Sequence, residues 1–292
     1  MKIAAVVVTY NRLSLLKECI QALRAQTYPL DKIIVVNNSS TDGTLEWLLQ
    51  QPDLDVVTQE NSGSAGGQYT GIKKAYDEAF DWIWCMDDDT IPSSDALLKL
   101  IDKIPPIEKH VEFEIGFLCS KVIWIDSTPH QMNIPAMRSS IGSLPFNFLN
   151  VDNVLLCESA SFVSIIFNRK AISKLGFPNK DYVIWGDDVE YSNRMTQNRY
   201  LGVYVNDSIV LHKTTKNKNA EIILEDEVNY VKFYYGVRNT ISNFRKYRKK
   251  FYFLMILKTL FYNPYLILFK RKNKRLKLLF LNMKALFASI NV

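Results

Sequence analysis

The 292-residue sequence lacks the short motifs that mark several large enzyme classes. It contains no Gly-x-Ser-x-Gly, no His-Glu-x-x-His and no Walker loop, and its glycine-rich stretch, NSGSAGGQYTG, lacks the order Gly-x-Gly-x-x-Gly. These absences remove the usual support for hydrolases, NTPases and Rossmann dehydrogenases. Repeats and low-complexity tracts are absent too, so the chain is expected to form one large domain or one domain with an appendage.

Cysteine is scarce. Cys19, Cys85, Cys119 and Cys157 lie far apart and form no Cys-x-x-Cys pair. The pattern predicts buried thiols in a reducing compartment, because a disulfide or zinc framework needs closer pairs. The first residues, MKIAAVVVTYNR, hold an apolar stretch too short for the core of a signal peptide. A cytoplasmic protein is therefore expected.

Acidic residues are missing from the C-terminal stretch. Residues 244–292 hold 13 of the 36 Lys and Arg residues and none of the 30 Asp and Glu residues. The overall net charge of +6 is therefore the sum of a negative first part and a strongly basic tail. The tail is expected to meet a different partner from the rest of the chain.

Strand-like and helix-like segments alternate in the first part. The apolar run 2–9 predicts a strand buried on both faces, and residues 13–26 carry apolar residues at helical spacing. Strands are likewise predicted at 32–37, 55–59 and 82–86, with a turn and short helix at 41–51 and a helix at 65–80. This alternation predicts an α/β fold with a Rossmann-like, mostly parallel sheet flanked by helices, and ligands at the carboxyl ends of its strands.

The second part continues in the same manner. A serine-capped helix is predicted around 93–104, and strands are predicted at 116–125 and 158–168. The polar, aperiodic stretch 126–153 is expected to be an active-site or acceptor loop. A pair of strands is predicted within 201–213.

Three adjacent carboxylates, Asp87 to Asp89, follow the predicted strand 82–86. Their mutual repulsion costs stability unless a cation or a solvated turn absorbs the charge. In an extended segment Asp87 and Asp89 would leave the same face and hold one divalent ion, and oxygen ligands suit Mg²⁺ or Mn²⁺. The alternative is an acidic turn that caps the helix near Ser93 or Ser94.

Two further features carry chemistry. His212 ends a predicted strand and could supply a nitrogen to the same ion, although a lone histidine is more often packed or solvated. Asp187, Asp188 and Glu190 stand at the start of a predicted helix, where carboxylates complement the helix dipole. A neighbouring charge could instead raise one pKa and make that carboxylate a general base. The spacing does not choose between these readings.

Five motifs in order, VVVTYNR, VVNNSSTDGT, ENSGSAGG, MDDDT and WGDDVEYSNR, resemble the family 2 glycosyltransferases of GT-A fold. The resemblance covers roughly residues 1–213 and is nearest to bacterial galactofuranosyl and rhamnosyl transferases. It implies inverting transfer of a sugar from a nucleotide-sugar donor, UDP-galactofuranose or alternatively dTDP-rhamnose. It implies a lipid-linked saccharide acceptor in bacterial surface polysaccharide synthesis.

The resemblance also implies roles for residues. Asp188 would be the catalytic base, and Asp87, Asp89 and His212 would hold Mn²⁺ or Mg²⁺ on the donor diphosphate. Asn38 stands where many relatives carry aspartate, and its amide oxygen can still accept from the pyrimidine. The expected nucleotide pocket comprises Thr9, Tyr10, Arg12, Asn38, Gly66, Gly67 and Asp88, and the expected sugar-binding residues are Trp185, Gly186, Asp187 and Glu190.

The basic tail is expected to form a helical region, residues 228–292, beside a catalytic domain, residues 1–227. Residues 251–269 are nearly long enough to span a bilayer, but Lys258 and the break at Asn263 and Pro264 favour an interfacial helical hairpin on anionic lipid. A helical subdomain that packs on the core or mediates homo-oligomerisation is the alternative. No nucleic-acid motif accompanies the charge.

Two other functions remain open. A non-catalytic nucleotide-sugar-binding module could share the fold, although the intact acidic motifs argue against it. A nucleotidyltransferase also uses carboxylates and Mg²⁺, but it usually places a Gly-rich, basic loop after the first strand, where this chain has TYNRLSLL.

Overall fold

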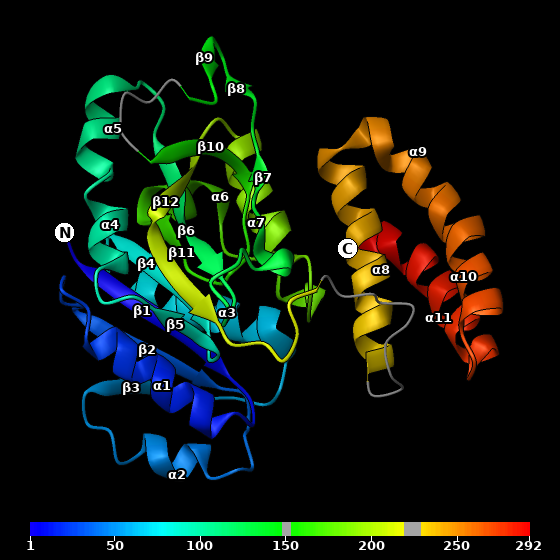
Figure 1. The fold of residues 1–292 in the computed structure, drawn as a ribbon, viewed down its shortest axis with the longest axis horizontal. Helices are drawn as coiled ribbons and strands as arrows, with labels where there is room; N and C mark the ends of the chain where they lie inside the picture. The colour runs from blue at the N-terminus through cyan, green and yellow to red at the C-terminus, as the bar shows by residue number, and fades with distance from the viewer. Residues whose placement is uncertain (148–152, 219–228) are drawn as a thin grey trace.

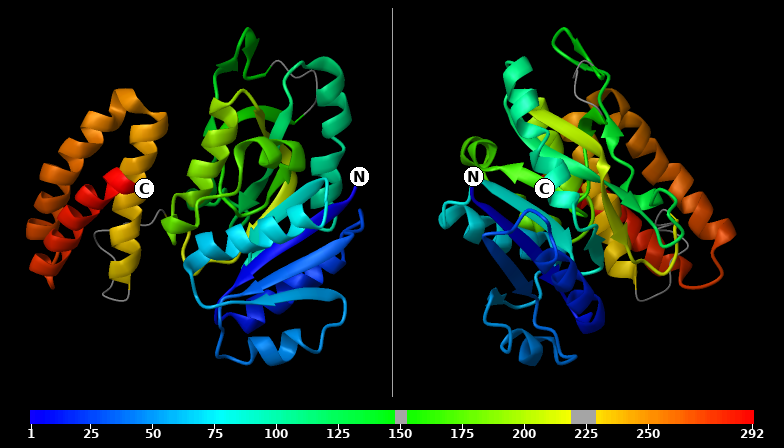
Figure 2. Two further views of the ribbon diagram at one scale, coloured as in Figure 1. Left: turned by 180° about the vertical axis from the view of Figure 1, so that it is seen from behind. Right: turned by 60° about the vertical axis from the view of Figure 1, so that its left-hand side comes forward.

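The computed structural model describes residues 1–147, 153–218 and 229–292. The chain forms a large α/β part built on one mixed sheet and a C-terminal bundle of helices beside it (Figure 1). The predicted domain boundary between residues 227 and 228 lies outside the described residues. Figure 2 shows the same two parts from two other directions.

The first half of the sheet follows the predicted alternation closely. In order it contains β1 (Ile3–Thr9), α1 (Leu13–Arg24), β2 (Lys32–Asn37), α2 (Thr44–Leu48), β3 (Leu54–Thr58), α3 (Gly63–Asp77) and β4 (Trp82–Asp87). The four strands pair in parallel in the order β3-β2-β1-β4. Their carboxyl ends therefore meet at one edge, where β1 aligns Val8 with Asp87 of β4.

The second half of the sheet mixes strand directions. Strands β6 and β12 continue the parallel set, whereas β11 runs antiparallel between β4 and β6. At the far side β10 and β7 extend the sheet, and β5 pairs with the end of β12. The elements are β5 (Thr90–Pro92), α4 (Ala96–Ile101), α5 (Ile104–His110), β6 (Ile115–Ile123), η1 (Gln131–Asn133), β7 (Ala136–Met137), β8 (Ser140–Ile141), β9 (Leu144–Pro145), β10 (Val154–Ser159), β11 (Ile165–Asn168), α6 (Arg169–Leu175), η2 (Lys180–Tyr182), α7 (Asp187–Gln197) and β12 (Leu201–His212).

The predicted α/β fold with a mostly parallel sheet is confirmed, and β11, β10 and β5 are the strands that run against the others. Three other expectations need correction. The predicted strand 158–168 is divided between two strands, β10 and β11. Strand β10 pairs with β12, whereas β11 lies between β4 and β6, and the chain turns at Ser164 (φ 63°) before β11. The predicted strand pair within 201–213 is one strand with a register shift between Val205 and Ile209. No serine side chain caps α4, whose N-cap is Asp95.

The alternating side chains of the strands fill two cores, one on each face of the sheet. Ile3, Ala5 and Val7 of β1 join the core that includes α1 and α4. Ala4 and Val6 join the core on the other face, which includes α3 and α7. Parallel strands covered by helices on both faces bury both sets of side chains, which explains the continuous apolar run. All four cysteines are buried free thiols, as predicted.

The C-terminal bundle has its own small apolar core. Its helices are α8 (Tyr230–Tyr247), α9 (Lys249–Leu257), η4 (Lys258–Tyr262), α10 (Asn263–Lys270), α11 (Arg275–Ala288) and η5 (Ser289–Asn291). Phe233 and Ile241 of α8 pack with Ile267 and Leu278 from the other helices. In Figure 1, α8 lies nearest to the α/β part, while α9, α10 and α11 lie on its far side.

The predicted break at Asn263 and Pro264 does not occur, since helix continues from Lys249 to Lys270. Proline is tolerated there because it stands in the first turn of α10, after the π-helical turn η4. The Asn263 side chain donates to Asn282 of α11 (2.9 Å). This 22-residue helix is, among the described residues, the one long and apolar enough to cross a membrane, and 17% of its apolar window is buried.

Candidate active site

The carboxylates Asp88 and Asp89 are neutralised in part by Arg12, which follows β1. Arg12 Nη1 donates to Asp89 Oδ2 (2.6 Å) and to Asp88 Oδ1 (3.3 Å), while the Thr9 hydroxyl donates to Asp88 Oδ2 (2.8 Å). Both carboxylates are nearly inaccessible to solvent. A buried pair of anions beside one cation leaves negative charge uncompensated.

The expected alternation of Asp87 and Asp89 fails because β4 ends at Asp87 and the next two residues form a turn. Burial, and then the neighbouring Asp89, raises the pKa of Asp87 to about 6. Burial also raises the pKa of Asp88 to about 6, against the opposing effect of Arg12. Burial and neighbouring negative charge therefore disfavour the ionised forms of Asp87 and Asp88.

His212 lies where the sequence predicted, beside this turn, because β5 pairs the end of β12 with the residues that follow Asp89. Its Nε2 lies 3.1 Å from Asp89 Oδ1, and its Nδ1 lies 2.8 Å from Asn133 Oδ1. The contact with Asn133 orients the ring so that Nε2 faces Asp89. The fully buried ring of His130 stacks on His212, with 4.5 Å between the centroids.

This arrangement fits a divalent cation. Asp89 Oδ1 is buried and lies 3.1 Å from His212 Nε2, so a carboxylate oxygen and an imidazole nitrogen stand side by side. Carboxylate oxygens are the ligands that Mn²⁺ and Mg²⁺ prefer, and an imidazole nitrogen can join them on a metal ion. Over the described ranges, however, no three His, Cys, Asp or Glu side chains already form a metal site. Asp87 as third ligand stays a prediction.

The residues expected around the nucleotide have mixed surroundings. Tyr10 is about half exposed at the same edge of the sheet, where its backbone amide approaches Asp88. The Asn38 amide is engaged within the protein, since it donates to the Gly63 carbonyl (3.1 Å) and accepts from Gln59 (2.8 Å). Its contact with a base stays a prediction.

The two glycines Gly66 and Gly67 are buried in the first turns of α3. A Cβ added at Gly67 would lie 2.4 Å from Val8 Cγ1, and one at Gly66 would lie 2.1 Å from Ser62 Oγ. Close packing of α3 therefore suffices to explain both glycines, and their approach to phosphate stays a prediction.

The second acidic group stands at the start of α7, behind a strained loop at residues 182–186. Val183 (φ 62°) and Trp185 (φ 63°) adopt positive φ, and Gly186 (φ 89°) forms the N-cap of α7. Such backbone conformations cost free energy for residues with a Cβ and persist only when the surroundings hold them. No pattern in the sequence predicted these positive φ angles.

Helix α8 holds this loop through two asparagines one turn apart. Asn239 Nδ2 lies within hydrogen-bond distance of the carbonyl oxygens of Tyr182 (2.9 Å), Ile184 (3.1 Å) and Trp185 (2.7 Å). Asn243 Nδ2 donates to the Gly186 carbonyl (2.9 Å). Sequence reasoning missed both residues, and their spacing of four was the only signal.

The carboxylates of α7 have unusual environments. Asp187 is buried, its Oδ2 has no hydrogen-bond partner in the part of the chain that the structure describes, and burial raises its pKa well above the ordinary value. Burial, and to a lesser degree the charge of Asp87, raises the pKa of Asp188 to about 6. A nearby negative charge thus raises the pKa of Asp188, but its effect is smaller than the effect of burial. The charge of Asp87 contributes to the raised pKa of both Asp187 and Asp188.

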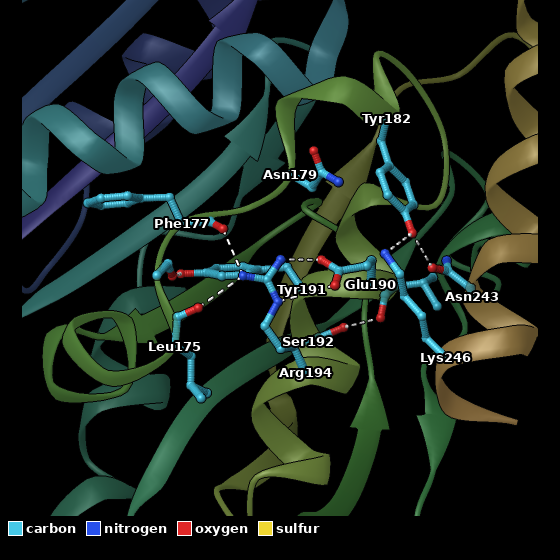
Figure 3. A network of polar contacts seen from close by, with 12 residues as sticks. Leu175, Phe177, Asn179, Tyr182, Glu190, Tyr191, Ser192, Arg194, Asn243 and Lys246 are labelled. Atoms are coloured by element: carbon cyan, nitrogen blue, oxygen red, sulfur yellow. Dashed lines mark hydrogen bonds and ion pairs between the residues drawn. The ribbon is translucent and has the colours of Figure 1, made fainter. Parts of the chain in front are cut away.

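Glu190 differs from the other α7 carboxylates because its partners are structural. It forms an ion pair with Arg194 and accepts from the Tyr247 hydroxyl of α8 (2.6 Å). Figure 3 shows Glu190 and Arg194 together, and Arg194 also reaches the Leu175 and Phe177 carbonyls. Glu190 therefore joins α7 to α8, and its expected contact with a sugar stays a prediction.

Comparison with known proteins agrees with this geometry. A sequence model described as glycosyl transferase family 2 matches residues 4–152. The galactofuranosyltransferase GlfT1 of Mycolicibacterium smegmatis (strain ATCC 700084 / mc(2)155) is 27% identical over 203 residues, which cover 67% of this chain and 65% of that protein. The chain thus spans slightly less than two thirds of that relative.

Solved structures share the fold at low identity. The crystal structure of S. aureus TarS 1-349 superposes with a TM-score of 0.62 at 16% identity, over 100% of this chain and 80% of that chain. GalNAc-T7, crystallised with UDP, GalNAc and Mn²⁺, superposes with a TM-score of 0.61 at 15% identity, over 83% of this chain and 50% of that chain.

Proposed function

Because the chain belongs to glycosyl transferase family 2 and has the GT-A fold, we propose that it transfers a sugar from a nucleoside diphosphate donor to a saccharide hydroxyl. The observation that carries the proposal is a chain of contacts between two acidic groups that lie far apart in the sequence. His212 Nε2 lies 3.1 Å from Asp89, which follows β4, and His212 Nδ1 lies 2.8 Å from Asn133. Asn133 in turn lines one pocket with Asp188 of α7. A site for a metal diphosphate beside a site for a base is what this transfer requires.

The first acidic group would hold the metal. Asp89 and His212, with Asp87 as the third ligand, would bind Mn²⁺ or Mg²⁺, and the bound ion would neutralise the charge of the leaving diphosphate. GalNAc-T7, a structural neighbour, was crystallised with Mn²⁺, which supports this assignment. Arg12 bridges Asp88 and Asp89 and would be free to turn toward phosphate once a metal takes over their charge.

The second acidic group would supply the base. With a pKa of about 6, Asp188 is mostly ionised at pH 7 and still basic enough to accept a proton. The acceptor oxygen would form a bond to the anomeric carbon as the bond from that carbon to the diphosphate oxygen breaks. The hydroxyl proton passes to Asp188, and the nucleoside diphosphate leaves. One displacement inverts the anomeric centre.

The donor we favour is UDP-galactofuranose, supported by the similarity to GlfT1 over 67% of this chain. The alternatives are dTDP-rhamnose and a chain that binds nucleotide sugars without catalysis. A lipid-linked glycan of a bacterial surface polysaccharide is the proposed acceptor, reached from the cytoplasmic face of the membrane.

The test is turnover with a panel of nucleotide sugars in Mn²⁺, measured as nucleotide release and product mass. Asp188→Asn should reduce transfer at least about 100-fold and leave donor binding intact, as expected for loss of a general base. Asp181→Asn, an exposed carboxylate seven residues earlier, is the matched control and should retain activity. Undiminished turnover of Asp188→Asn would refute the base, and a wild-type chain that binds every donor but turns over none would be a binding module.

We further propose that the C-terminal bundle docks the enzyme on an anionic lipid surface. Charge complementarity argues for it, since the region after residue 244 carries Lys and Arg but no Asp or Glu. The helix from Lys249 to Lys270 also leaves most of its apolar surface uncovered. Its exposed large apolar residues are Phe251, Phe253, Leu254, Leu260, Phe261, Tyr262, Tyr265, Leu268 and Phe269.

Vesicle flotation tests this surface. Vesicles of phosphatidylglycerol and phosphatidylcholine should carry the wild-type chain with them, and the triple variant Phe253→Glu, Phe261→Glu, Phe269→Glu should stay behind. Glu46→Gln, a charge change on α2 of the α/β part, serves as the control. A chain that ignores vesicles and instead dimerises through the same phenylalanines would favour homo-oligomerisation.

A further inference from the structure

A pocket of about 270 Å³ opens where the α/β part meets α8. One wall is the segment that follows β6, another is the start of α7, and the third is the end of α8. Asp188 belongs to its lining, whereas Trp185, Gly186 and Glu190 do not. The lining residues are Met132, Asn133, Ile134, Ala136, Ser159, Ala160, Ser161, Asp188, Val189, Asn193, Asn243, Phe244, Tyr247 and Arg248.

A buried polar atom in this lining lacks a partner. Asn193 of α7 is 2% exposed, and its Oδ1 makes no hydrogen bond to any residue that the structure describes. Burial of an amide oxygen without a partner costs roughly 1–3 kcal/mol, so such an atom in a pocket wall indicates a missing donor. A sugar hydroxyl is such a donor.

The rest of the lining combines apolar and polar surfaces. The aromatic ring of Tyr247 is fixed because its hydroxyl donates to Glu190, and Phe244 lies one turn earlier on α8. The Ser161 hydroxyl already accepts from Asn133 (2.8 Å) and keeps its own proton to donate. Pyranose and furanose rings have apolar C–H faces edged by hydroxyls, which matches aromatic walls with a few converging polar groups.

We propose that this pocket binds the terminal saccharide residue of the acceptor and presents its hydroxyl to Asp188. The assignment rests on the proposed glycosyltransfer and names the acceptor subsite within it. Its volume falls below the roughly 300–1,000 Å³ of pockets for drug-sized ligands, so it fits one sugar unit and leaves the rest of the acceptor outside. Helix α8, which belongs to the C-terminal bundle, thereby completes the active site.

The pocket's position also explains why α8 is fixed so firmly to α7. The wall contributed by α8 keeps its distance from Asp188 only if the two helices move together. Asn243 joins the wall to the Gly186 carbonyl at the N-cap of α7, and Tyr247 joins it to Glu190. The bond from Asn243 that helps to hold the loop at 182–186 therefore also fixes one wall of the acceptor pocket.

Binding of neutral octyl glycosides tests the assignment without knowledge of the natural acceptor. The probes are octyl β-galactofuranoside, octyl α-rhamnopyranoside and octyl N-acetyl-β-glucosaminide, added to the full chain with UDP and Mn²⁺ and followed by saturation-transfer NMR. Asn193→Ala and Phe244→Ala should weaken binding of the preferred probe at least about tenfold. Val189→Trp, which adds bulk at a residue that is 37% exposed, should block the pocket without disturbing the core.

Matched controls are Asn198→Ala, exposed at the end of α7, and Phe280→Ala, exposed on α11. Both should bind the probe as the wild type does, and both should hydrolyse the donor slowly at the wild-type rate. If no octyl glycoside binds, or if the three pocket variants bind as tightly as the controls while donor hydrolysis persists, the pocket assignment is overturned and the proposed function stands. A wild-type chain that neither binds nor hydrolyses any nucleotide sugar overturns both.

Discussion

Replacement of Asn239 by alanine should loosen the loop that precedes the proposed base. Asn239 is fully buried on α8, and its side-chain nitrogen lies within hydrogen-bond distance of three carbonyl oxygens of the loop. Its own Oδ1 accepts from Arg238 Nε (2.9 Å). Alanine removes all of these interactions and fits the same helix without strain.

The cost can be estimated from the partners that remain. The Tyr182 carbonyl keeps the Ile184 amide (2.7 Å), whereas the Ile184 and Trp185 carbonyls lose the amide donor. Two partly buried carbonyls at about 1 kcal/mol each, with about 1.5 kcal/mol for the bond from the buried Arg238 guanidinium, give a cost of roughly 3–4 kcal/mol. Since Val183 and Trp185 hold positive φ only under constraint, the loop should also relax locally.

Urea denaturation and amide hydrogen exchange measure the two effects. Asn239→Ala should lower the free energy of unfolding by roughly 3–4 kcal/mol and accelerate exchange at residues 182–189 in particular. Asn239→Asp should do no better, because it places carboxylate oxygens against carbonyl oxygens. Asn198→Ala, an exposed asparagine, should stay within about 0.5 kcal/mol of the wild type. A loss below about 1 kcal/mol with unchanged exchange in the loop would refute the claim that α8 holds it.

Three further predictions follow from single contacts. Burial raises the pKa of Asp88 to about 6, so between about pH 4 and pH 6 the native state holds a proton that the unfolded state has lost. The free energy of unfolding therefore falls as the pH rises through that window. Asp88→Asn lacks this loss, and in urea titrations it should gain about 2 kcal/mol relative to the wild type across the window. Asn133→Ala frees Nδ1 of His212 and should weaken Mn²⁺ binding by about tenfold in calorimetry, whereas unchanged affinity would show that the ring needs no such support. Gly67→Ala should cost about 1–3 kcal/mol in urea because its Cβ would meet Val8, and a stabilised variant would contradict the packing argument.

The first half of the fold was predictable because its physics is local. A strand covered by helices on both faces must be apolar throughout, and the amphipathic helices between the strands show their period in the sequence. The bounds of β2 agree with the prediction residue for residue, and those of β1 and α1 agree closely. The second half was harder, since β11 reaches its place between β4 and β6 through long-range pairing that leaves no periodic signal.

The same division applies to the site. The carboxylates Asp87 to Asp89 and Asp187 to Asp188 were recognisable because uncompensated like charges in adjacent positions cost free energy wherever they stand. The place of His212 beside Asp89 was expected from the family resemblance and not from its spacing, and it arises from the pairing of β5 with the end of β12. The role of Asn239 was hidden, because an asparagine in a helical pattern looks the same whether it faces solvent or three carbonyls of a distant loop.

Amino-acid order alone thus determined which residues carry charge, which segments of the first half are strands or helices, and that the C-terminal region is basic and apolar. Only the tertiary structure decided that α8 packs against the loop at 182–186, that Glu190 joins two helices, and that α8 lines a pocket together with Asp188. The physical reason is the separation along the sequence of the residues that interact. Periodicity and charge repulsion act between neighbours in sequence, whereas hydrogen bonds between α8 and the loop at 182–186 join residues more than 50 positions apart.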